Sequence, residues 1–471
     1  MTHMSDNDLN NLSEKMANLQ ARIDRLPIRP YPRSWLAILG VGYFFAFYDI
    51  LSLSYALVSP MVTQLKLTEL LISVSVSITL FGYIVGTYIV STISDYTGRR
   101  LGLISNAIFI AVGTLISALS FNALELILGR FITGMGIGAE ISIINTYISE
   151  ITPAAIRGKM TQWTYFSGAL GFALTPFIAL ALIPINLNGW RYLFAIPVVV
   201  AIVIIFLRFI MPESPRWLVL KGKSEKAEEI VVNMESFVQK KIKTLPDIPY
   251  YKPEGKDSRF PTREIFTKKY GSRLAIVATF WFLDYTLAYG FLGFAPLIFE
   301  TSGFVFFSTV AYIGLGSMGY IVGALAMTFI ADKWERKYLV VSALIPAIIS
   351  VFVLALSLTI HSLDLLTIGI FMASFATAFA VPAYAYTAEV YPTEARATGF
   401  ALSDGIGHFG GVIVPYIFSA MVVLTVSNVV VTGSRFFILL GILEIVAAIV
   451  LLFGPRTTKR RLEDVSPDKV V

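Results

Sequence analysis

Cysteine is absent from the sequence, and charged residues are scarce. The 471 residues include three histidines, and Asp, Glu, Lys and Arg together make up 14% of the chain, against about 25% in an average soluble protein. Without cysteine, disulfides, zinc–thiolate sites and cysteine nucleophiles are excluded, and three histidines give no reason to expect a metal site. A soluble enzyme of this length would need far more polar surface, so that class is excluded as well.

Long apolar blocks fill the chain instead. Hydrophobic residues make up 56% of it, and a helix needs about 20 mostly apolar residues to cross the hydrocarbon core of a bilayer. The blocks are unbroken, whereas the strands of a membrane barrel alternate apolar and polar residues. We therefore expect an all-α polytopic membrane protein with twelve transmembrane helices. The blocks cover residues 34–59, 70–92, 101–120, 124–148, 162–184, 191–211, 274–299, 304–330, 338–358, 364–388, 398–424 and 434–454.

The basic residues predict the orientation in the membrane. Lys and Arg accumulate in cytoplasmic loops, and here they gather after the even-numbered blocks, in the loop over 212–271 and in the C-terminal tail. We therefore expect a cell-membrane protein with both termini in the cytoplasm. The net charge of +6 is then explained by the basic residues of the cytoplasmic loops, which also give some attraction to anionic lipid. We expect no nucleic-acid partner, because no folded soluble domain presents a basic patch.

A polar segment with an apolar stripe precedes the first block. The apolar residues recur at alternating spacings of three and four, which predicts a short amphipathic helix. The stripe consists of Leu9, Leu12, Met16, Leu19, Ile23 and Leu26. Two interpretations stay open: the helix packs on the cytoplasmic face or the membrane surface, or it forms a dimer contact. We otherwise expect a monomer, since the stripe is shorter than the three to four heptads of a coiled coil.

The two halves of the chain repeat each other. Polar motifs that follow the second and fourth blocks return after the eighth and tenth blocks at nearly equal separations, which indicates two six-helix halves in parallel repeat. The corresponding residues are Asp95 and Asp332, Glu150 and Glu389, and Arg157 and Arg396. The repeat divides the chain into an N-terminal segment, a first bundle, a linker, a second bundle and a tail, at 1–33, 34–211, 212–273, 274–454 and 455–471.

These loop motifs resemble those of the major facilitator superfamily, over nearly the whole chain from the first block to the twelfth. Pro212-Glu213-Ser214-Pro215-Arg216-Trp217-Leu218 is similar to a motif of the sugar-porter and organic-ion branch, and so is Glu389-Val390-Tyr391-Pro392-Thr393. Ser91 stands where the first loop motif of the superfamily usually has glycine. The resemblance implies two six-helix pseudo-repeats and transport by alternating access.

Carboxylates and arginines lie side by side in these loops, and such groups form strong, directional, charge-assisted bonds. We expect them to latch the two halves on the cytoplasmic side and to separate when that side opens, as the resemblance also implies. The alternative is that they only anchor helix ends at the membrane surface. The predicted gate residues are Asp95, Arg99, Arg100, Glu150, Arg157, Glu213, Arg216, Asp332, Arg336, Glu389 and Arg396.

Asp49 and Arg130 are ionisable residues inside predicted spans, where charge is costly and indicates function. Both lie in the outer part of their spans, and Asp49 follows an aromatic stretch. Burial favours the neutral form of a carboxyl group and a nearby cation favours the charged form, so a balanced group can load and release a proton. Proton-driven sugar porters carry an aspartate and an arginine at similar places, which implies that Asp49 carries the proton and Arg130 tunes it. The alternative is a permanent structural ion pair.

Glu140 is a second candidate for proton coupling. It lies near the middle of the fourth span, about 15 Å along the helix from both Arg130 and Glu150, so its own helix offers no cation. Such a carboxyl group must be neutral, or meet water, substrate or another helix. Proton-linked metabolite and phosphate symporters carry an acid here, and this resemblance favours a proton site. We expect Arg130 to be the only basic residue deep in a span.

Acidic and aromatic residues of later spans form a candidate substrate site. A few polar groups in an apolar wall are typical of a binding site, and Asp404 and His408 share one helical face. The alternatives are packing of the aromatic residues in the core or against lipid, and a structural Asp404–His408 pair. We expect Glu444 in the last span to be structural. The candidate substrate-binding residues are Tyr48, Trp281, Asp284, Tyr285, Tyr289, Asp404 and His408.

Together these features predict a secondary active transporter of a small solute and not an enzyme. No Gly-rich run ending in Lys-Ser/Thr is present to bind nucleotide, so we expect a proton-driven symporter with no cofactor besides the proton. Typical sugar porters carry two glutamines early in the seventh span, and this chain has none there. An organic anion such as a carboxylate is therefore favoured over a sugar. A sugar or organic-cation uniporter, a transporter-like sensor and an intramembrane aspartyl protease are the alternatives.

Overall fold

The computed structural model describes residues 6–251, 265–330, 334–379, 381–391, 396–424 and 429–457. These ranges contain helices and no strand, and twelve stretches of them are long and apolar enough to cross a membrane. The prediction of an all-α protein with twelve transmembrane helices is therefore confirmed. Asp332, one of the predicted gate residues, lies outside the described residues.

The first half contains six of the membrane-length stretches. The Thr68 and Asn122 side chains cap two of these helices by accepting backbone N–H groups of the first turn. Gly98, at a φ of 110°, lets the chain turn at once from the second stretch into the third. The helices are α2 (Arg33–Ala56), the short α3 (Met61–Gln64), α4 (Glu69–Thr97), α5 (Arg99–Leu119), α6 (Ala123–Ile151), α7 (Ala154–Leu182) with the 3-10 turn η1 (Ile183–Ile185), and α8 (Gly189–Phe209).

The second half repeats this arrangement, but two of its membrane-length stretches consist of two helices each. The helices are α11 (Lys268–Thr301), α12 (Phe306–Ser317) and α13 (Gly319–Ile330), α14 (Arg336–Ile360), α15 (Leu363–Phe379) and α16 (Val381–Glu389), α17 (Arg396–Leu424), and α18 (Val429–Leu452).

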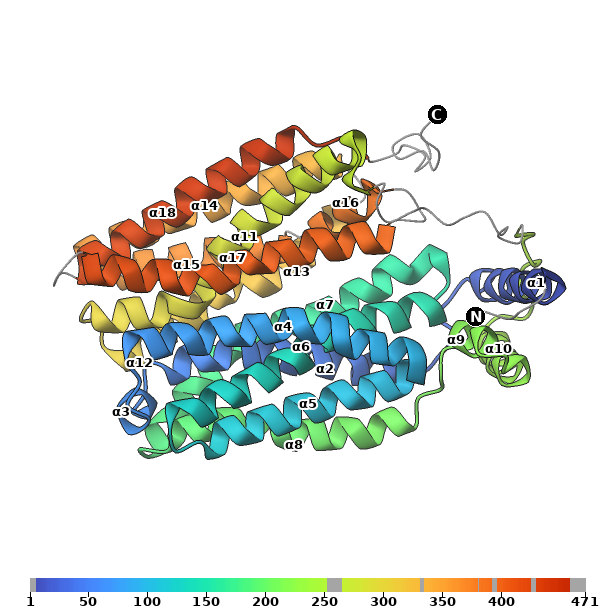
Figure 1. The fold of residues 1–471 in the computed structure, drawn as a ribbon, viewed down its shortest axis with the longest axis horizontal. Coiled ribbons are helices and arrows are strands. Elements are labelled where there is room, and N and C mark those ends of the chain that lie inside the picture. Colours follow the sequence, from blue (N-terminus) through green and yellow to red (C-terminus); the bar gives the residue numbers. More distant parts are fainter. Residues whose placement is uncertain are drawn as a thin grey trace.

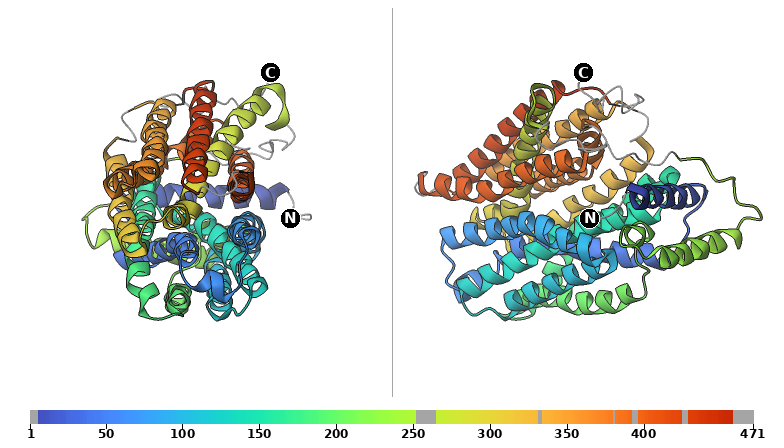
Figure 2. Two further views of the ribbon diagram at one scale, coloured as in Figure 1. Left: turned by 90° about the vertical axis from the view of Figure 1, so that its left-hand side faces the viewer. Right: turned by 45° about the vertical axis from the view of Figure 1, so that its right-hand side comes forward.

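The two halves lie side by side, as Figures 1 and 2 show. α4 packs along α17, α2 meets α11, and α7 meets α12 and α13. Buried hydrogen bonds cross the border: the Ser54 hydroxyl donates to the Leu292 carbonyl at 2.7 Å, and the Ser73 hydroxyl donates to the Pro415 carbonyl at 3.0 Å. These contacts come from side chains at the beginning or end of the helices concerned, so they join the halves near one end of the molecule.

Glycines bring α4 and α6 into backbone contact within the first half. A Cβ atom at Gly134 would lie 2.0 Å from the Thr79 carbonyl oxygen, and one at Gly86 would lie 2.0 Å from the Met135 carbonyl oxygen. Small residues permit such close helix packing in membranes. The contact fixes α6, which carries Arg130, against its neighbour.

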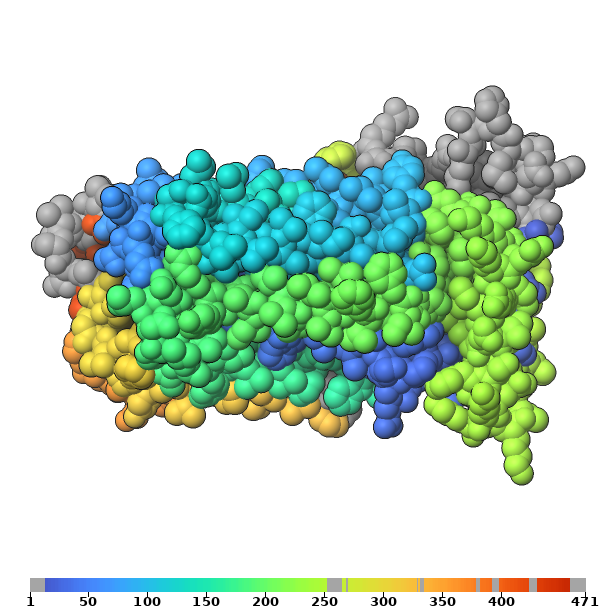
Figure 3. Space-filling view, turned by 90° about the horizontal axis from the view of Figure 1, so that it is seen from below, coloured from blue at the N-terminus to red at the C-terminus, as the bar shows by residue number. Residues whose placement is uncertain are grey.

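Three helices outside the bundle gather at one end, which we call the linker end. They are α1 (Asp6–Asp24), α9 (Pro215–Leu220) and α10 (Ser224–Gln239), and Figures 1 and 3 show α9 and α10 beyond the ends of the bundle helices. The opposite end carries α3 and η1.

The stripe of α1 packs within its own chain. Leu19 and Ile23 are buried in a cluster with Trp217 and Val231 of α9 and α10. The interpretation that this helix packs on the face of the molecule therefore holds, and a dimer contact through these two side chains is wrong, because α9 and α10 already cover them. The side chains of Leu9 and Leu12 lie outside the described residues.

Candidate functional site

A cavity of about 990 Å³ lies between the two halves. Its walls come from α2, α4, α6 and α7 on one side and from α11 and α14 to α17 on the other. It reaches the linker end, where Ser149, Arg216 and Ala388 line it. Towards the opposite end its lining stops near Leu292, the residue whose carbonyl accepts the Ser54 hydroxyl. The cavity thus opens at one end only.

Aromatic rings surround His408 in the middle of this cavity. Tyr83 of the first half stacks on the imidazole with ring centres 4.2 Å apart, and Tyr285 lies 4.3 Å away. Tyr289 adds a third ring at 5.9 Å. The His408 Nδ1 atom lies 2.9 Å from the Asp404 carbonyl oxygen. Because Tyr83 and His408 belong to different halves, a solute held here contacts both.

Asp404 and its neighbours form the polar part of the same wall. The Tyr285 hydroxyl donates to Asp404 Oδ1 at 2.8 Å and lies 2.9 Å from the Tyr384 hydroxyl. Trp281 stacks on Tyr384 at 4.8 Å, and its indole N–H donates to Thr387. All these residues except Thr387 line the cavity. The structure therefore brings Trp281, Tyr285, Tyr289, Asp404 and His408 together, as the sequence predicts.

Two residues of this wall are absent from the sequence prediction. Tyr83 and Tyr384 line the cavity, but neither lies beside an ionisable residue of its own span. The repeat offers a signal for Tyr384, because it precedes the Glu389 motif by one and a half helical turns and so shares that helix with a predicted gate. No comparable signal marks Tyr83.

Tyr48, predicted to bind substrate, does not line the cavity. Its side chain is completely buried, and its hydroxyl donates to the Leu193 carbonyl of α8 at 3.0 Å. The helical rotation from Tyr43 and Phe47, which do line the cavity, turns Tyr48 towards the interior of the first half. In this conformation Tyr48 therefore does not belong to the cavity wall, contrary to the expectation from the sequence.

Asp49 and Arg130 form a buried ion pair, as predicted. Arg130 Nη1 donates to Asp49 Oδ2 at 2.9 Å, and neither side chain has any exposed surface. Arg130 also donates to the Asp49 carbonyl and to the Thr79 hydroxyl, and its guanidinium lies over the Phe194 ring. Neither residue lines the cavity. The pair is therefore sealed inside the first half in this conformation.

Glu140 has a partner that the sequence pattern does not predict. Arg208 of α8 forms a salt bridge with Glu140, and both side chains are buried. Arg208 also donates to the Asn106 side chain at 2.9 Å. The expectation that Arg130 is the only basic residue deep in a span is therefore wrong. Arg208 lies in the last turn of α8, where a long side chain usually extends to the surface but here turns inward.

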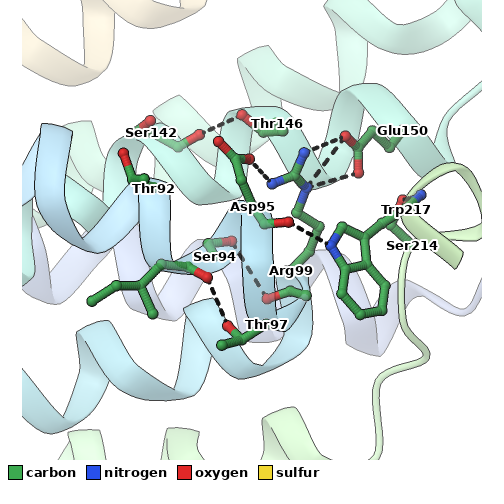
Figure 4. A network of polar contacts seen from close by, with 12 residues as sticks. Thr92, Ser94, Asp95, Thr97, Arg99, Ser142, Thr146, Glu150, Ser214 and Trp217 are labelled. Atoms are coloured by element: carbon green, nitrogen blue, oxygen red, sulfur yellow. Dashed lines mark hydrogen bonds and ion pairs between the residues drawn. The ribbon is translucent and has the colours of Figure 1, made fainter. Parts of the chain in front are cut away.

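Charged residues also join the helix ends at the linker end, and Figure 4 shows the network in the first half. Arg99 forms ion pairs with Asp95 and with Glu150, the latter at 3.0 Å. The Trp217 indole N–H donates to the Asp95 carbonyl. Glu213 accepts the Arg99 backbone N–H at 2.7 Å; burial raises the pKa of Glu213, and these backbone donors oppose that rise.

The ion pairs of the predicted gate residues stay within one half. Arg336 pairs with Glu389 in the second half, and Arg157 lies 4.0 Å from Asp24 of α1. Arg100 contributes its backbone N–H to Glu213, and Arg216 lines the mouth of the cavity. The side chain of Arg396 lies outside the described residues. Among the residues that the structure describes, these pairs join helices of one half, so a latch between the halves is not formed in this conformation.

Asp284 completes the set of predicted substrate-binding residues at the cavity. It lines the wall from α11, and its carboxyl group lies within hydrogen-bonding reach of Glu444 on α18. The described residues contain no group of three or more His, Cys, Asp or Glu side chains arranged to hold a metal ion.

Comparison with known proteins places this site in context. A family model described as "Sugar (and other) transporter" matches residues 36–468. YyaJ of Bacillus subtilis, named for metabolite transport, is 28% identical over 95% of this chain and 97% of its own length. The niacin transporter NiaP of Acinetobacter baylyi is 23% identical over 95% of this chain and 99% of its own.

The fold is also that of a solved transporter. The crystal structure of a D-xylose–proton symporter covers 90% of this chain and 98% of its own, with 21% identity and a TM-score of 0.68. This chain is therefore a multi-pass membrane protein that belongs to the sugar (and other) transporter family of the major facilitator superfamily, whose members move small molecules and are not enzymes.

Proposed function

We propose that this protein is a proton-coupled symporter that carries a small organic carboxylate into the cell by alternating access. The observation that carries the proposal is the cavity between the halves, open at one end, with a buried Asp49–Arg130 pair in the helices behind its wall. The binding surface is made by both halves, so rocking them about it would expose it to each side in turn.

The lining of the cavity favours a planar, acidic solute. Rings of Tyr83, Tyr285 and Trp281 offer flat apolar faces, while His408 supplies a group that gains positive charge on protonation. NiaP, a relative over nearly the whole chain, is named for niacin, which is an aromatic carboxylate. A sugar is the second candidate, because the family and the solved structure include sugar transport.

Asp49 and Arg130 supply the proposed coupling. A proton that reaches Asp49 neutralises the carboxylate and leaves the Arg130 guanidinium without its counter-ion, at a cost that favours rearrangement of α2 against α6. Loss of the proton restores the pair. Glu140 remains a prediction for a second coupling residue; its salt bridge with Arg208 gives it the same chemistry.

The conformation fits the inward-facing state of such a cycle. The charge distribution predicts that the linker end is cytoplasmic, so the cavity would open to the cytoplasm and the Ser54 and Ser73 bonds would close the outer side. The proposal therefore includes a cell-membrane location, cytoplasmic termini and a monomer as the working unit.

Uptake into proteoliposomes tests the proposal. Labelled nicotinate and labelled D-xylose are offered with the outside more acidic than the inside, and protein-free liposomes correct for passive entry of the acid. We expect nicotinate to accumulate above its equilibrium level, and a protonophore to abolish this. Asp49→Asn should lose accumulation but keep exchange of labelled for unlabelled solute, whereas the exposed Asp364→Asn should resemble wild type. Full uphill uptake by Asp49→Asn and by Glu140→Gln would overturn the coupling assignment.

A further inference from the structure

Two carboxyl groups meet inside the second half, away from the Asp49–Arg130 pair. Asp284 of α11 and Glu444 of α18 lie within hydrogen-bonding reach of each other. Glu444 is completely buried, and neither of its carboxyl oxygens finds a donor among the residues that the structure describes. Asp284 lines the cavity. One member of the pair therefore reaches the solute pathway, and the other lies behind it.

No basic side chain among the described residues neutralises this pair. The groups that act on Asp284 and Glu444 electrostatically are the two carboxyls themselves, and neither forms a described salt bridge. Two tyrosines face Asp284, from α7 and from its own helix. The ionisable residues on the helices packed around the pair include Tyr165, Tyr289, Asp404, His408, Lys337 and Arg435. Arg273 of α11 is about 16 Å along the helix from Asp284 and donates to the Val390 carbonyl.

The charged members of that set are occupied or distant. Asp404 and His408 contact each other and Tyr285. Lys337 donates to the carbonyls of Leu452 and Gly454, and Leu452 is about 12 Å along α18 from Glu444. Arg435 is about 14 Å along the same helix in the other direction. None of these charged residues therefore offsets the negative charge of the Asp284–Glu444 pair.

Glu444 is completely buried and Asp284 is partly buried. Two adjacent carboxylates repel each other, and burial adds a penalty that is larger for the Glu444 charge, so both cannot be ionised at neutral pH. One proton between them removes this repulsion and supplies the donor that the Glu444 oxygens otherwise lack. We infer that Asp284 and Glu444 form a proton-binding site in the second half, which holds one shared proton at neutral pH and exchanges it with the cavity through Asp284.

This site goes beyond the proposed function, since occupancy by a proton does not depend on what the protein carries or on the Asp49 assignment. It revises two expectations from the sequence: Glu444 becomes a functional residue, and Asp284 becomes a proton ligand instead of a direct substrate ligand. The bound proton belongs to the pair and not to either residue alone.

Infrared spectroscopy of the purified, lipid-reconstituted full chain tests the site without any solute. A protonated carboxyl group has its own carbonyl stretching band, and an ionised one does not. At pH 7 we expect Asp284→Asn/Glu444→Gln to lack the intensity of one protonated carboxyl relative to wild type. Glu69→Gln, which removes an exposed carboxylate, should leave the band unchanged. Equal bands in wild type and the double variant would overturn the proposal.

A single variant keeps the test decisive if the double variant does not fold. Glu444→Gln retains the shape of the pair and supplies an amide donor, so Asp284, in contact with the cavity, should ionise and the band should fall by one carboxyl. An unchanged band would contradict the shared proton. Asp49→Asn should leave this band unaltered, because Asp49 is paired with Arg130; failure of the coupling proposal is thereby separated from failure of this one.

Discussion

Two arginines are completely buried in the first half, and each faces one carboxylate. Arg130 meets Asp49, and Arg208 meets Glu140. A buried pair contributes little net stability, but loss of one partner leaves an uncompensated charge in a medium that solvates it poorly. Each residue of these two pairs therefore needs its partner. Any event that neutralises one of the carboxylates destabilises the arrangement around its arginine.

The pair of Glu140 and Arg208 allows this coupling to be measured. Glu140→Gln should lower the free energy of unfolding by about 3 to 5 kcal/mol, because it leaves Arg208 buried without its carboxylate. Thermal or denaturant unfolding of the detergent-solubilised protein measures the change. Glu140→Gln combined with Arg208→Gln should recover a large part of the loss, and a double variant as unstable as the sum of the two single variants would show that the residues do not interact.

A comparison of two tyrosines distinguishes a residue of the cavity wall from a residue that only packs inside the first half. Tyr48→Phe removes the hydrogen bond to the Leu193 carbonyl inside the first half, at about 1 kcal/mol of stability, and should leave the KM for uptake unchanged. Tyr285→Phe removes the donor to Asp404 in the cavity wall and should raise KM severalfold. Uptake kinetics over a range of solute concentrations measure the KM of both variants. A raised KM for Tyr48→Phe would show that Tyr48 contributes to solute binding after all.

The sequence predicts the role of a residue where a charge inside a span is costly. It does not predict the role where the direction of the side chain decides whether the residue faces the cavity, another helix or the surface. Asp49 and Arg130 are identifiable because an ionisable group in an apolar span is energetically costly and is therefore a candidate for function. Arg208 escapes because an arginine in the last turn of a span can extend outward or inward, and the sequence does not record which. Tyr48 fails for the same reason: two helix faces are equally apolar, and only packing against α8 selects one.

At the scale of elements, α1 shows how an amphipathic segment is fixed by charge as well as by apolar contact. Arg22 and Arg25 of the first helix and its exit both form ion pairs with Glu235 of α10. Asp24 accepts the backbone N–H of Ala154 at the beginning of α7. The linker helices are thus tied both to the N-terminal helix and to the bundle, so movement of one half is transmitted to them.

The docking of α1 should depend on pH only under acid conditions. Burial acts to raise the pKa of Glu235, but hydrogen bonds from Arg22 and Arg25 outweigh it and hold the pKa below its ordinary value of 4.5. The contribution of the carboxylate is therefore complete above that value and is lost as pH falls through the lowered folded-state pKa. The protection of the α1 amides, taken relative to their intrinsic exchange rate at each pH, should therefore stay constant from pH 6 to 8 in wild type.

Glu235→Gln should mimic the acid state at neutral pH. We expect at least a severalfold faster hydrogen exchange of α1 at pH 7, because two arginines lose their carboxylate partner. Glu229→Gln, an exposed neighbour on the same helix, is the matched control and should exchange like wild type. Equal exchange in both variants would mean that the apolar stripe alone holds the helix.

The twelve spans are predictable because length and hydropathy are physical requirements of crossing a bilayer. The residues at which the helices begin and end are less predictable. The helix α7 begins at Ala154, before the predicted block 162–184, since Arg157 and Lys159 are polar enough to lie outside hydrocarbon while still continuing the helix. Hydropathy marks the depth of the membrane, whereas backbone hydrogen bonding decides where the helix starts.

At the scale of the whole molecule, hydrogen bonds cross between the halves at both ends, but with different burial. The partly exposed Tyr88 hydroxyl donates to the Ala401 carbonyl towards the linker end, whereas the bonds of Ser54 and Ser73 at the opposite end are buried. Serine hydroxyls of α2 and α4 donate across the border at the opposite end, whereas the gate ion pairs at the linker end stay within their own halves. Hydroxyl-to-carbonyl bonds are neutral and individually modest, so the closed end can open without separating charges. The repeat in the sequence predicts the two halves, but not which end is closed, because both arrangements use the same residues.

The absence of cysteine makes the closed end directly testable. A Cβ atom at Gly293 of α11 would lie 3.5 Å from Val76 Cγ1 of α4. The Cγ1 atom stands where a cysteine at position 76 would place its sulfur, so cysteines at these two positions face each other at close range. Val76→Cys/Gly293→Cys should therefore cross-link the halves under mild oxidation, which mass spectrometry of the linked peptides detects in a chain with no competing thiol. Alternating access requires this end to open, so the cross-link should reduce uptake at least tenfold and a reductant should restore it. Each single-cysteine variant should transport normally under both conditions. A cross-linked protein that transports at the wild-type rate would rule out rocking of the halves about the cavity.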